Sequence, residues 1–312
     1  MKIITFDDIK KLNIQNGTYY KWIEEIITKK DSTCLPPKIS MKQEGHIFYN
    51  VMPCIIPDEN VAGVKLVTRF PNREPSLDGD IMIYSTESGQ LLSVMDGIYI
   101  TAMRTGAMAA LAIQTLAVDN YYEIGIVGLG NTARSTLLIL LDQIGNREIK
   151  IKLFKYKGQE KLFIERFSRY SNITFEVVDS YEELIRNSDV VLSCVTYFEG
   201  NISEDEWYKK GCLLVPVHTM GFQNCDLFFD RVIVDDKGHV ENFKNYNKFK
   251  YCCELSEVLN KKSIGRLNHE ERIIAYNIGI SIEDIYFAKK IYDLIDNKTD
   301  VMLKELKDKF WV

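Results

Sequence analysis

The feature that most constrains this chain is an alternation of short apolar runs and helix-like segments from residue 122 onward. The runs are IGIVG, IKIKLF, ITFEVV, DVVLSCV, CLLVPVH and RVIVDD, which are rich in Val, Ile and Leu. Near-continuous apolar strands separated by helices are typical of a parallel sheet covered on both faces. The region is therefore predicted to be α/β, with a doubly wound parallel sheet.

A glycine-rich turn follows the first run and fits the pattern GxGxxA before a helix expected from about residue 131 to 144. In a Rossmann domain the first glycine permits the turn, the second lets the backbone approach a pyrophosphate, and Ala keeps helix and strand close. The helix N-terminus adds unpaired N–H groups and a positive dipole end. A bare junction is the alternative, but within this βαβ series a dinucleotide site is favoured. The cofactor-binding candidates are Gly128, Gly130, Asn131, Thr132 and Ala133.

The end of the second strand bears on the choice of dinucleotide. An Asp or Glu there would bind the ribose 2′-hydroxyl of NAD, but the segment reads LFKYKGQ. Lys155 and Lys157 are candidates to neutralise the 2′-phosphate of NADP, which is therefore slightly favoured over NAD. A pair of solvated surface lysines with NAD bound is the alternative.

The chain before the glycine turn has a different pattern. It begins with a short strand and a helical segment, followed by the strand-like runs GHIFYNVMP, VAGVKLVTRFP and GDIMIYSTESGQLLSVMDG. A hairpin turn is expected at Ser88-Gly89, and an Ala-rich helix at 100–117. A domain boundary is placed near residues 118–120. A helix from Ser281 to about Leu294 is expected to close the second domain, and DVMLKELKDKFWV at the end to return to the first.

Composition narrows the classes of function. A net charge of −5 and a pI near 5.6 argue against a large nucleic-acid footprint, which would need a clustered basic face. No apolar run reaches the roughly 18 residues of a membrane span, and MKIITFDDIKKL lacks a signal-peptide core, so a cytoplasmic location is expected. The seven cysteines form no CxxC pair and no metal-like spacing with histidine, so reduced thiols and no metal site are expected.

Several stretches, in order, resemble the ornithine cyclodeaminase/mu-crystallin family. They are GVKLVTRFPN at 63–72, STESGQLLSVMDGIYITAMRTGAMAALA at 85–112, ELSEVLNKKSIGR at 254–266 and AYNIGISIED at 275–284. The second stretch is the most specific. In the third, Asn260-Lys261 replaces the family's usual Gly-Lys.

The resemblance implies a homodimer with two domains. Residues 1–118 with 290–312 would form a substrate-binding and dimerisation domain, and residues 119–289 a Rossmann dinucleotide-binding domain. Members include cyclodeaminases, alanine dehydrogenases, ketimine reductases, siderophore-pathway enzymes that oxidise amino-acid conjugates, and a hormone-binding crystallin. Their shared step is hydride exchange between a nicotinamide and the α-carbon of an amino or imino acid.

The implied substrate carries a carboxylate, which requires fixed cations. Arg104, in AMRTG, matches the family arginine that binds it, and a guanidinium suits bidentate contact. Its Ala-rich helix is expected to be buried, where an unpaired charge is costly, so a ligand role is favoured over a surface pairing. Lys38, in PPKIS, stands where many members have Arg; a solvent-facing lysine is the equal alternative.

Lys65, in GVKLV, matches the family's catalytic lysine. Burial and a nearby cation would lower its pKa, so that it can carry a proton on the substrate nitrogen or activate water. A lysine pointing to solvent from an edge strand is the alternative. Thr86 and Thr101 are further substrate-binding candidates, and Thr105 and Gly279 are cofactor-binding candidates.

The segment VHTMGFQNCDLFF at 217–229 departs from the family. Cyclodeaminases carry an aspartate shortly after the glycine corresponding to Gly221, but here only four residues separate Gly221 from Asp226. Asp226 aligns better with a later acidic-Leu pair, so the orienting aspartate is absent. His218 and Gln223 remain as polar groups for nicotinamide or substrate, with a hydrogen-bonded core histidine slightly favoured for His218.

The sequence therefore favours an NAD(P)-dependent oxidoreductase acting on a small amino acid, a cyclic imino acid or an N-linked conjugate. Redox-neutral deamination of the ornithine cyclodeaminase type is the alternative within the enzymes. A catalytically weak cofactor- and ligand-binding protein of the mu-crystallin type is the alternative from another class.

Overall fold

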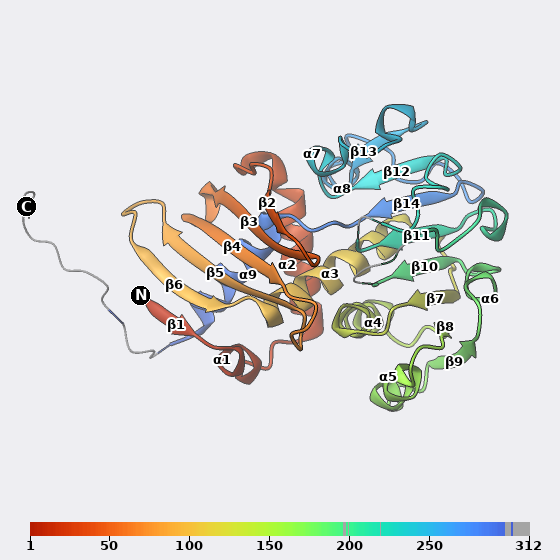
Figure 1. Ribbon diagram of the computed structural model, residues 1–312, viewed down its shortest axis with the longest axis horizontal. Coiled ribbons are helices and arrows are strands. Elements are labelled where there is room, and N and C mark those ends of the chain that lie inside the picture. The colour runs from red at the N-terminus through yellow and green to blue at the C-terminus, as the bar shows by residue number, and fades with distance from the viewer. Residues whose placement is uncertain (196–197, 199, 219, 297–300, 302–312) are drawn as a thin grey trace, which may run out of the picture. The chain divides into compact units, whose positions relative to one another are not determined.

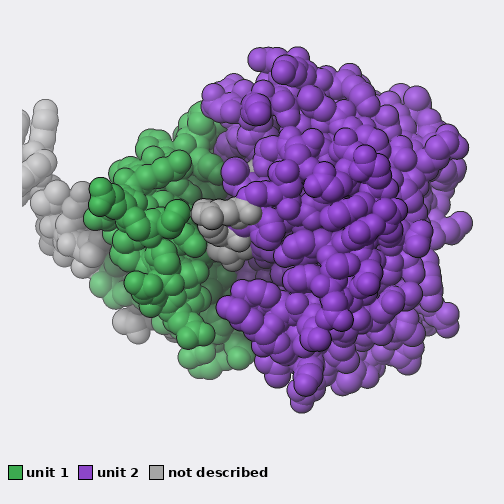
Figure 2. Space-filling model, turned by 45° about the vertical axis from the view of Figure 1, so that its right-hand side comes forward, with its two compact units in different colours: residues 1–14, 32–101, 284–312 green, residues 15–31, 102–283 purple. Residues whose placement is uncertain are grey.

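A computed structural model of the chain describes residues 1–195, 198, 200–218, 220–296 and 301. The chain divides into two compact units, which Figure 2 shows in different colours. Unit 1 comprises Met1–Ile14, Ser32–Thr101 and Asp284–Val312, and unit 2 comprises Gln15–Asp31 and Ala102–Glu283. The domain limits inferred from sequence and family, 1–118 with 290–312 and 119–289, stay a prediction. No described helix is long and apolar enough to span a bilayer.

Unit 1 is built on a six-stranded sheet, visible in Figure 1, with the order β1-β6-β5-β4-β3-β2. Neighbouring strands are antiparallel except for the parallel pair β1 and β6. The predicted hairpin turn is present, because Gly89 has a φ of +70° and its N–H donates to the Ser85 carbonyl. The strands are β1 (Lys2–Ile4), β2 (Ile39–Gln43), β3 (Ile47–Ile56), β4 (Val61–Arg69), β5 (Leu77–Ser85) and β6 (Leu91–Asp96), and α1 spans Phe6–Lys11.

One face of β4 is covered by the helix α9 (Ser281–Leu294). Val61, Gly63 and Lys65 are buried on this face, and the residues between them are partly exposed on the other. A Cβ at Gly63 would collide with the side chain of Ile285, so glycine permits the close approach of helix and strand. This packing buries a lysine on the apolar face of the sheet.

Unit 2 contains an eight-stranded sheet with the order β13-β12-β14-β11-β10-β7-β8-β9, in which every pair is parallel. The doubly wound α/β fold predicted from the apolar runs is therefore confirmed. The chain moves outward from β7 to β8 and β9, then returns to β10 on the other side of β7. The strands are β7 (Glu123–Val127), β8 (Ile149–Phe154), β9 (Ile173–Val178), β10 (Val190–Ser193), β11 (Leu213–Pro216), β12 (Arg231–Val234), β13 (Cys252–Glu254) and β14 (Ile273–Tyr276).

The helices of unit 2 follow the predicted pattern with local differences. They are α2 (Asn16–Thr28), α3 (Ile98–Leu116, which begins in unit 1), α4 (Asn131–Ile144), α5 (Gln159–Phe167), α6 (Tyr181–Ile185), α7 (Lys237–Val240) and α8 (Leu255–Leu259). The sequence SEDEWYKKG forms only a 3-10 turn at Asp205–Trp207 instead of the expected helix. The turn ends at Tyr208, which is extended with φ −85° and ψ 117° and whose ring is buried against Phe229, so tertiary packing overrides the helical pattern. The C-terminal segment lies outside the described residues except for Val301, which exchanges backbone hydrogen bonds with Met1.

Candidate functional site

The glycine turn lies where β7 ends and α4 begins. Gly128 has a φ of +82°, and a Cβ there would collide with the backbone of Cys194, which follows the neighbouring strand β10. Gly130 is the N-cap of α4, is exposed, and has no heavy atom within 4 Å of a Cβ built on it. Gly128 is therefore required by the fold, whereas the space at Gly130 is open.

This turn fits a dinucleotide pyrophosphate. No side chain caps α4 at Gly130, so the first N–H groups of the helix, at Asn131, Thr132 and Ala133, need acceptors from outside it. The turn follows the carboxyl end of β7, next to β10, where the strand order reverses. In open α/β sheets, ligands bind at this reversal. The dinucleotide would lie here with its phosphates on the backbone of the turn.

Helix α3, which carries the RTG motif, packs closely against α4. A Cβ at Gly106 would lie within 2.7 Å of the Ser135 backbone. The Ser135 hydroxyl donates to the carbonyl of Ala102 at 2.7 Å. Gly106 thus fixes α3 beside the helix that begins at the glycine turn, which gives the glycine of RTG a packing role.

Arg104 is buried, with 5% of its surface exposed, and its Nη1 donates to Oε2 of Glu283 at 2.6 Å. Its guanidinium also lies against Gly279, where φ is +90° and a Cβ would collide with it. The Gly279 N–H in turn donates to the buried Asp235 carboxylate at 2.5 Å. Burial raises the pKa of Asp235 above its ordinary value. Arg104 and the cofactor candidate Gly279 are therefore in contact, while a role of Gly279 in cofactor binding stays a prediction.

Lys65 lies on the buried face of β4 in unit 1 and is 1% exposed. Its Nζ donates to Oδ1 of Asp284, which is 0% exposed, at 2.7 Å. Met52 and Ile81 are its neighbours on the adjacent strands. The alternative of a lysine pointing to solvent is thus excluded by the structure. The sequence predicts a nearby cation that would favour the neutral amine. The partner that the structure gives to Lys65 is the anion Asp284, which favours the charged form.

The remaining substrate and cofactor candidates have less distinctive surroundings. Lys38 is partly buried and directly precedes β2. Thr86 is exposed in the hairpin turn, and its N–H donates to the carbonyl of Asn60. The Thr101 hydroxyl donates to the carbonyl of Gly97, which directly precedes α3, and Thr105 is partly buried.

The two lysines after β8 are exposed. Lys155 pairs with Asp179 at 3.1 Å, with 61% and 79% of the two side chains exposed. Lys157 has a φ of +50° and its Nζ lies over the ring of Tyr156. No acid occupies the last position of β8, which is Phe154. Both cations therefore remain accessible at the end of the strand where the adenosine ribose is expected.

His218 follows β11, and its Nε2 lies 2.7 Å from the hydroxyl of Ser193 at the end of β10. Its ring packs on Phe222. Burial lowers the pKa of His218 from 6.5 to about 4, so the ring is neutral at neutral pH. The ring is hydrogen-bonded as expected but only partly buried, and a contact with substrate or nicotinamide stays a prediction.

Acidification is expected to destabilise the protein through His218. Because its folded-state pKa of about 4 lies below the unfolded value of 6.5, stability is lost as the pH falls from 6.5 towards 4. The linkage predicts a loss of about 2 kcal/mol from this group between pH 7 and pH 5. Urea unfolding of the wild type and of His218→Asn at both pH values measures this contribution. Equal pH dependence in the two proteins would contradict the assignment.

Two other polar residues of the shortened loop have structural partners. Asp226 is buried, its Oδ1 accepts a hydrogen bond from Asn245 at 2.8 Å, and burial raises its pKa. The Gln223 side chain accepts the Gly221 N–H at 2.9 Å. Asp226 is therefore used in packing and is not presented to a ligand.

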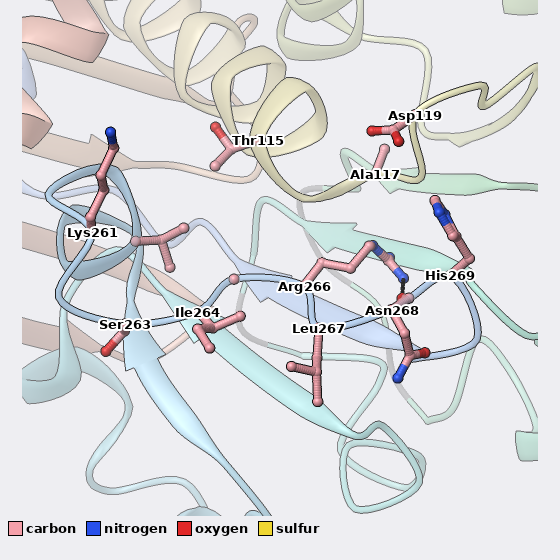
Figure 3. A pocket seen from close by; sticks show the side chains of 12 residues that line it. Thr115, Ala117, Asp119, Lys261, Ser263, Ile264, Arg266, Leu267, Asn268 and His269 are labelled. Atoms are coloured by element: carbon pink, nitrogen blue, oxygen red, sulfur yellow. Dashed lines mark hydrogen bonds between the residues drawn. The ribbon is translucent and has the colours of Figure 1, made fainter.

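A cavity of about 570 Å³ lies elsewhere, lined by residues at the end of α3, before β7, and between α8 and β14. Figure 3 shows Arg266 among the side chains that line it. Its guanidinium donates to the carbonyls of Leu116, Gly211 and Glu271. These bonds give the arginine of the ELSEVLNKKSIGR motif a structural role, and the cavity lies at the amino edge of the sheet, opposite the glycine turn.

The sequence did not identify two residues that contact its candidates, Glu283 and Asp284. They are separated from Arg104 and Lys65 by 179 and 219 positions. A signal was present, because two adjacent acids interrupt the otherwise apolar start of α9, in the segment SIEDIYFA.

Comparison with known proteins identifies the family of the chain. The model of the ornithine cyclodeaminase/mu-crystallin family matches residues 3–299. The ketimine reductase mu-crystallin of Macropus fuliginosus is 27% identical over 81% of each chain. Two solved structures share the fold. The Δ1-pyrroline-2-carboxylate reductase of Thermococcus litoralis, in complex with NADH and L-proline, has a TM-score of 0.83 at 24% identity, covering 94% of this chain and 97% of that one.

The second structure is an archaeal alanine dehydrogenase dimer with bound NAD. Its TM-score is 0.85 at 22% identity, covering 97% of this chain and 99% of that one. The resemblance inferred from the motifs is confirmed by the family match, which extends over nearly the whole sequence. This chain belongs to the ornithine cyclodeaminase/mu-crystallin family.

Proposed function

We propose that the protein is a cytoplasmic NAD(P)-dependent oxidoreductase that exchanges hydride with the α-carbon of a small amino or imino acid. The observation that carries the proposal is the glycine turn, with its open space at Gly130 and its uncapped helix α4. The family relationship adds the substrate class, since relatives include ketimine reductases and Δ1-pyrroline-2-carboxylate reductases.

The chain's own residues have distinct roles in this proposal. The Arg104 guanidinium, with Lys38, binds the substrate carboxylate, for which a fork of N–H donors is suited. The Lys65 Nζ holds or delivers the proton on the substrate nitrogen. The bound nicotinamide supplies or accepts the hydride, while the protein orients the reactants and excludes water.

A cyclic imino acid is the favoured substrate, and cyclodeamination is disfavoured. Asp226 is buried and bonded to Asn245, so the loop supplies no aspartate to orient the distal amine that a cyclodeaminase must bind. A substrate that is already a cyclic imine needs no such group. N-linked amino-acid conjugates and open-chain amino acids are the other members of the substrate class.

NADP is proposed as the preferred cofactor. The support is the pair of exposed cations Lys155 and Lys157, with no acid at the end of β8. Asp179 lies 3.1 Å from Lys155 and weakens its attraction for a phosphate. We therefore expect a modest preference, with NAD also bound.

The protein is proposed to act as a homodimer through unit 1. Apolar side chains on the face of the sheet away from α9, among them Val64, Leu66, Met82 and Tyr84, are partly exposed. Such a face is typical of a surface that a partner covers. The alanine dehydrogenase of the same fold is described as a dimer.

The proposal is tested by cofactor binding followed by turnover. Calorimetry with NADPH and NADH should give binding of both, with NADPH several-fold tighter. Cyclic imines, L-proline, L-alanine and L-ornithine are then supplied, and cofactor absorbance and ammonia are followed. Net oxidation of the cofactor by a cyclic imine is expected. Ammonia from L-ornithine without net cofactor change would indicate cyclodeamination, and binding without any turnover would indicate a ligand-binding protein.

A further inference from the structure

The first turn of α9 carries two adjacent carboxylates that are completely buried. Glu283 and Asp284 are both 0% exposed. Glu283 accepts from Arg104 at 2.6 Å, and Asp284 accepts from Lys65 at 2.7 Å. The two cations proposed to contact the substrate are thus each bound to one of two consecutive residues.

Stability does not explain these pairs well. Burying two charges costs about as much as their attraction returns, and an apolar replacement is often neutral or stabilising. The position of the acids reduces the cost, since carboxylates in the first turn of a helix interact favourably with its dipole. The role of these pairs is therefore better explained by what the carboxylates do to Arg104 and Lys65 than by stability.

Each acid restricts a long side chain that would otherwise occupy many rotamers. Arg104 comes from α3 and Lys65 from β4, and both are held at the head group by a charge-assisted hydrogen bond. Gly279 adds a second constraint on Arg104, because a Cβ at this position would collide with the guanidinium. A group held in one orientation before substrate arrives loses less entropy on binding.

We propose that Glu283 and Asp284 are positioning residues: Glu283 orients Arg104 for the substrate carboxylate, and Asp284 orients Lys65 and keeps it protonated. This inference rests on the proposed function and adds two residues to it. Glu283 acts on substrate binding and Asp284 on proton transfer, so their substitution has different kinetic consequences.

The isosteric variants Glu283→Gln and Asp284→Asn separate the two roles. Glu283→Gln should raise KM for the imino acid by about 10- to 100-fold with a smaller change in kcat, since the negative charge that holds the guanidinium is removed and the amide oxygen accepts only a weaker hydrogen bond. Asp284→Asn should lower kcat and move the limb of the pH–rate profile that depends on Lys65 to lower pH. Removing the anion lowers the pKa of the Lys65 amine because the neutral form is then favoured. Its neighbours on the adjacent strands, Met52 and Ile81, carry no charge that would replace the lost carboxylate.

A control is a largely buried ion-pair cluster of similar distances in unit 2. Glu254 pairs with Lys30 at 2.6 Å, with side chains 16% and 7% exposed, and Lys30 also pairs with Asp236 at 2.7 Å. Glu254→Gln should lower the midpoint of urea unfolding and leave KM and the pH–rate profile unchanged. Asp284→Glu, which keeps the charge, should restore the position of the pH limb.

Two readouts do not require turnover. Calorimetric binding of L-proline to the cofactor complex measures the contribution of Arg104 to carboxylate binding. NMR titration of ¹³C-labelled lysine measures the protonation of Lys65. The inference is overturned if Glu283→Gln and Asp284→Asn change only stability, as Glu254→Gln does. If the wild-type protein neither turns over an imino acid nor binds a carboxylate, the proposed function fails. Separately, an unchanged titration of Lys65 in Asp284→Asn would overturn the positioning role of Asp284.

Discussion

Replacing Lys65 by methionine is expected to lower kcat/KM for an imino acid by about a thousandfold, the usual range for loss of a general acid or base. Methionine fills similar space on the buried face of β4 but has no proton to carry. Cofactor affinity should be unchanged, because the glycine turn is built from β7 and α4. Single-turnover kinetics with saturating cofactor measure the loss.

Lys65→Met also lowers the stability of the protein, and this effect must be separated from the loss of catalysis. Without Lys65, the Asp284 carboxylate remains fully buried with its ion pair broken, which costs about 3–5 kcal/mol. The double variant Lys65→Met/Asp284→Asn replaces both charges and should recover most of the stability. If the folded double variant turned over substrate at the wild-type rate, the catalytic role of Lys65 would be excluded.

The fold was predictable because its determinants are local. Six of the eight strands in the unit 2 sheet appear as apolar runs, whereas β13 and β14 were not predicted from the sequence. The positive φ of Gly128 is required at a strand-to-helix junction whose spacing is fixed. The Ala-rich helix at 100–117 corresponds to α3, and the long final helix to α9. In these cases the period of the apolar residues alone determines the element.

The contacts of the functional cations were not predictable in the same way. Lys65 is flanked by Val64 and Leu66, so the alternation along β4 leaves open which face is covered. The answer depends on α9, more than 200 positions later. Glu283 and Asp284 become interpretable only when tertiary structure brings each next to its cation.

The residues of the shortened loop illustrate a second limit. Asp226 and His218 are polar residues that equally fit a binding role or a packing role in the sequence. The structure gives each a nearby partner, Asn245 for Asp226 and Ser193 for His218. Hydrogen-bond satisfaction of buried groups is a property of the folded chain, which a pattern of residue types does not encode.

Substituting Gly130 by aspartate is expected to abolish dinucleotide binding while leaving the fold intact. The φ of −75° suits any residue, and nothing lies within 4 Å of the new Cβ. Asp is a favoured N-cap that interacts well with the helix dipole, so the stability of α4 should be unchanged or slightly higher. The same carboxylate would occupy the place of the pyrophosphate and repel it, which predicts a loss of affinity of about a hundredfold or more.

A matched control introduces the same charge at another helix N-terminus. Gln15 is the N-cap of α2 and makes no side-chain capping bond. The beginning of α2 lies against the end of α4, because a Cβ at Gly17 would collide with the carboxylate of Asp142. That position is about 20 Å from Gly130 along a helix of 14 residues. Gln15→Asp should therefore bind cofactor like the wild type.

Calorimetric titration of NADPH into wild type, Gly130→Asp and Gln15→Asp tests the dinucleotide site most directly. The expected result is binding by the wild type and by Gln15→Asp, with none detected for a Gly130→Asp protein that unfolds at the wild-type temperature or above. Undiminished NADPH affinity in folded Gly130→Asp would contradict the assignment of the glycine turn as the dinucleotide site, and with it the oxidoreductase function.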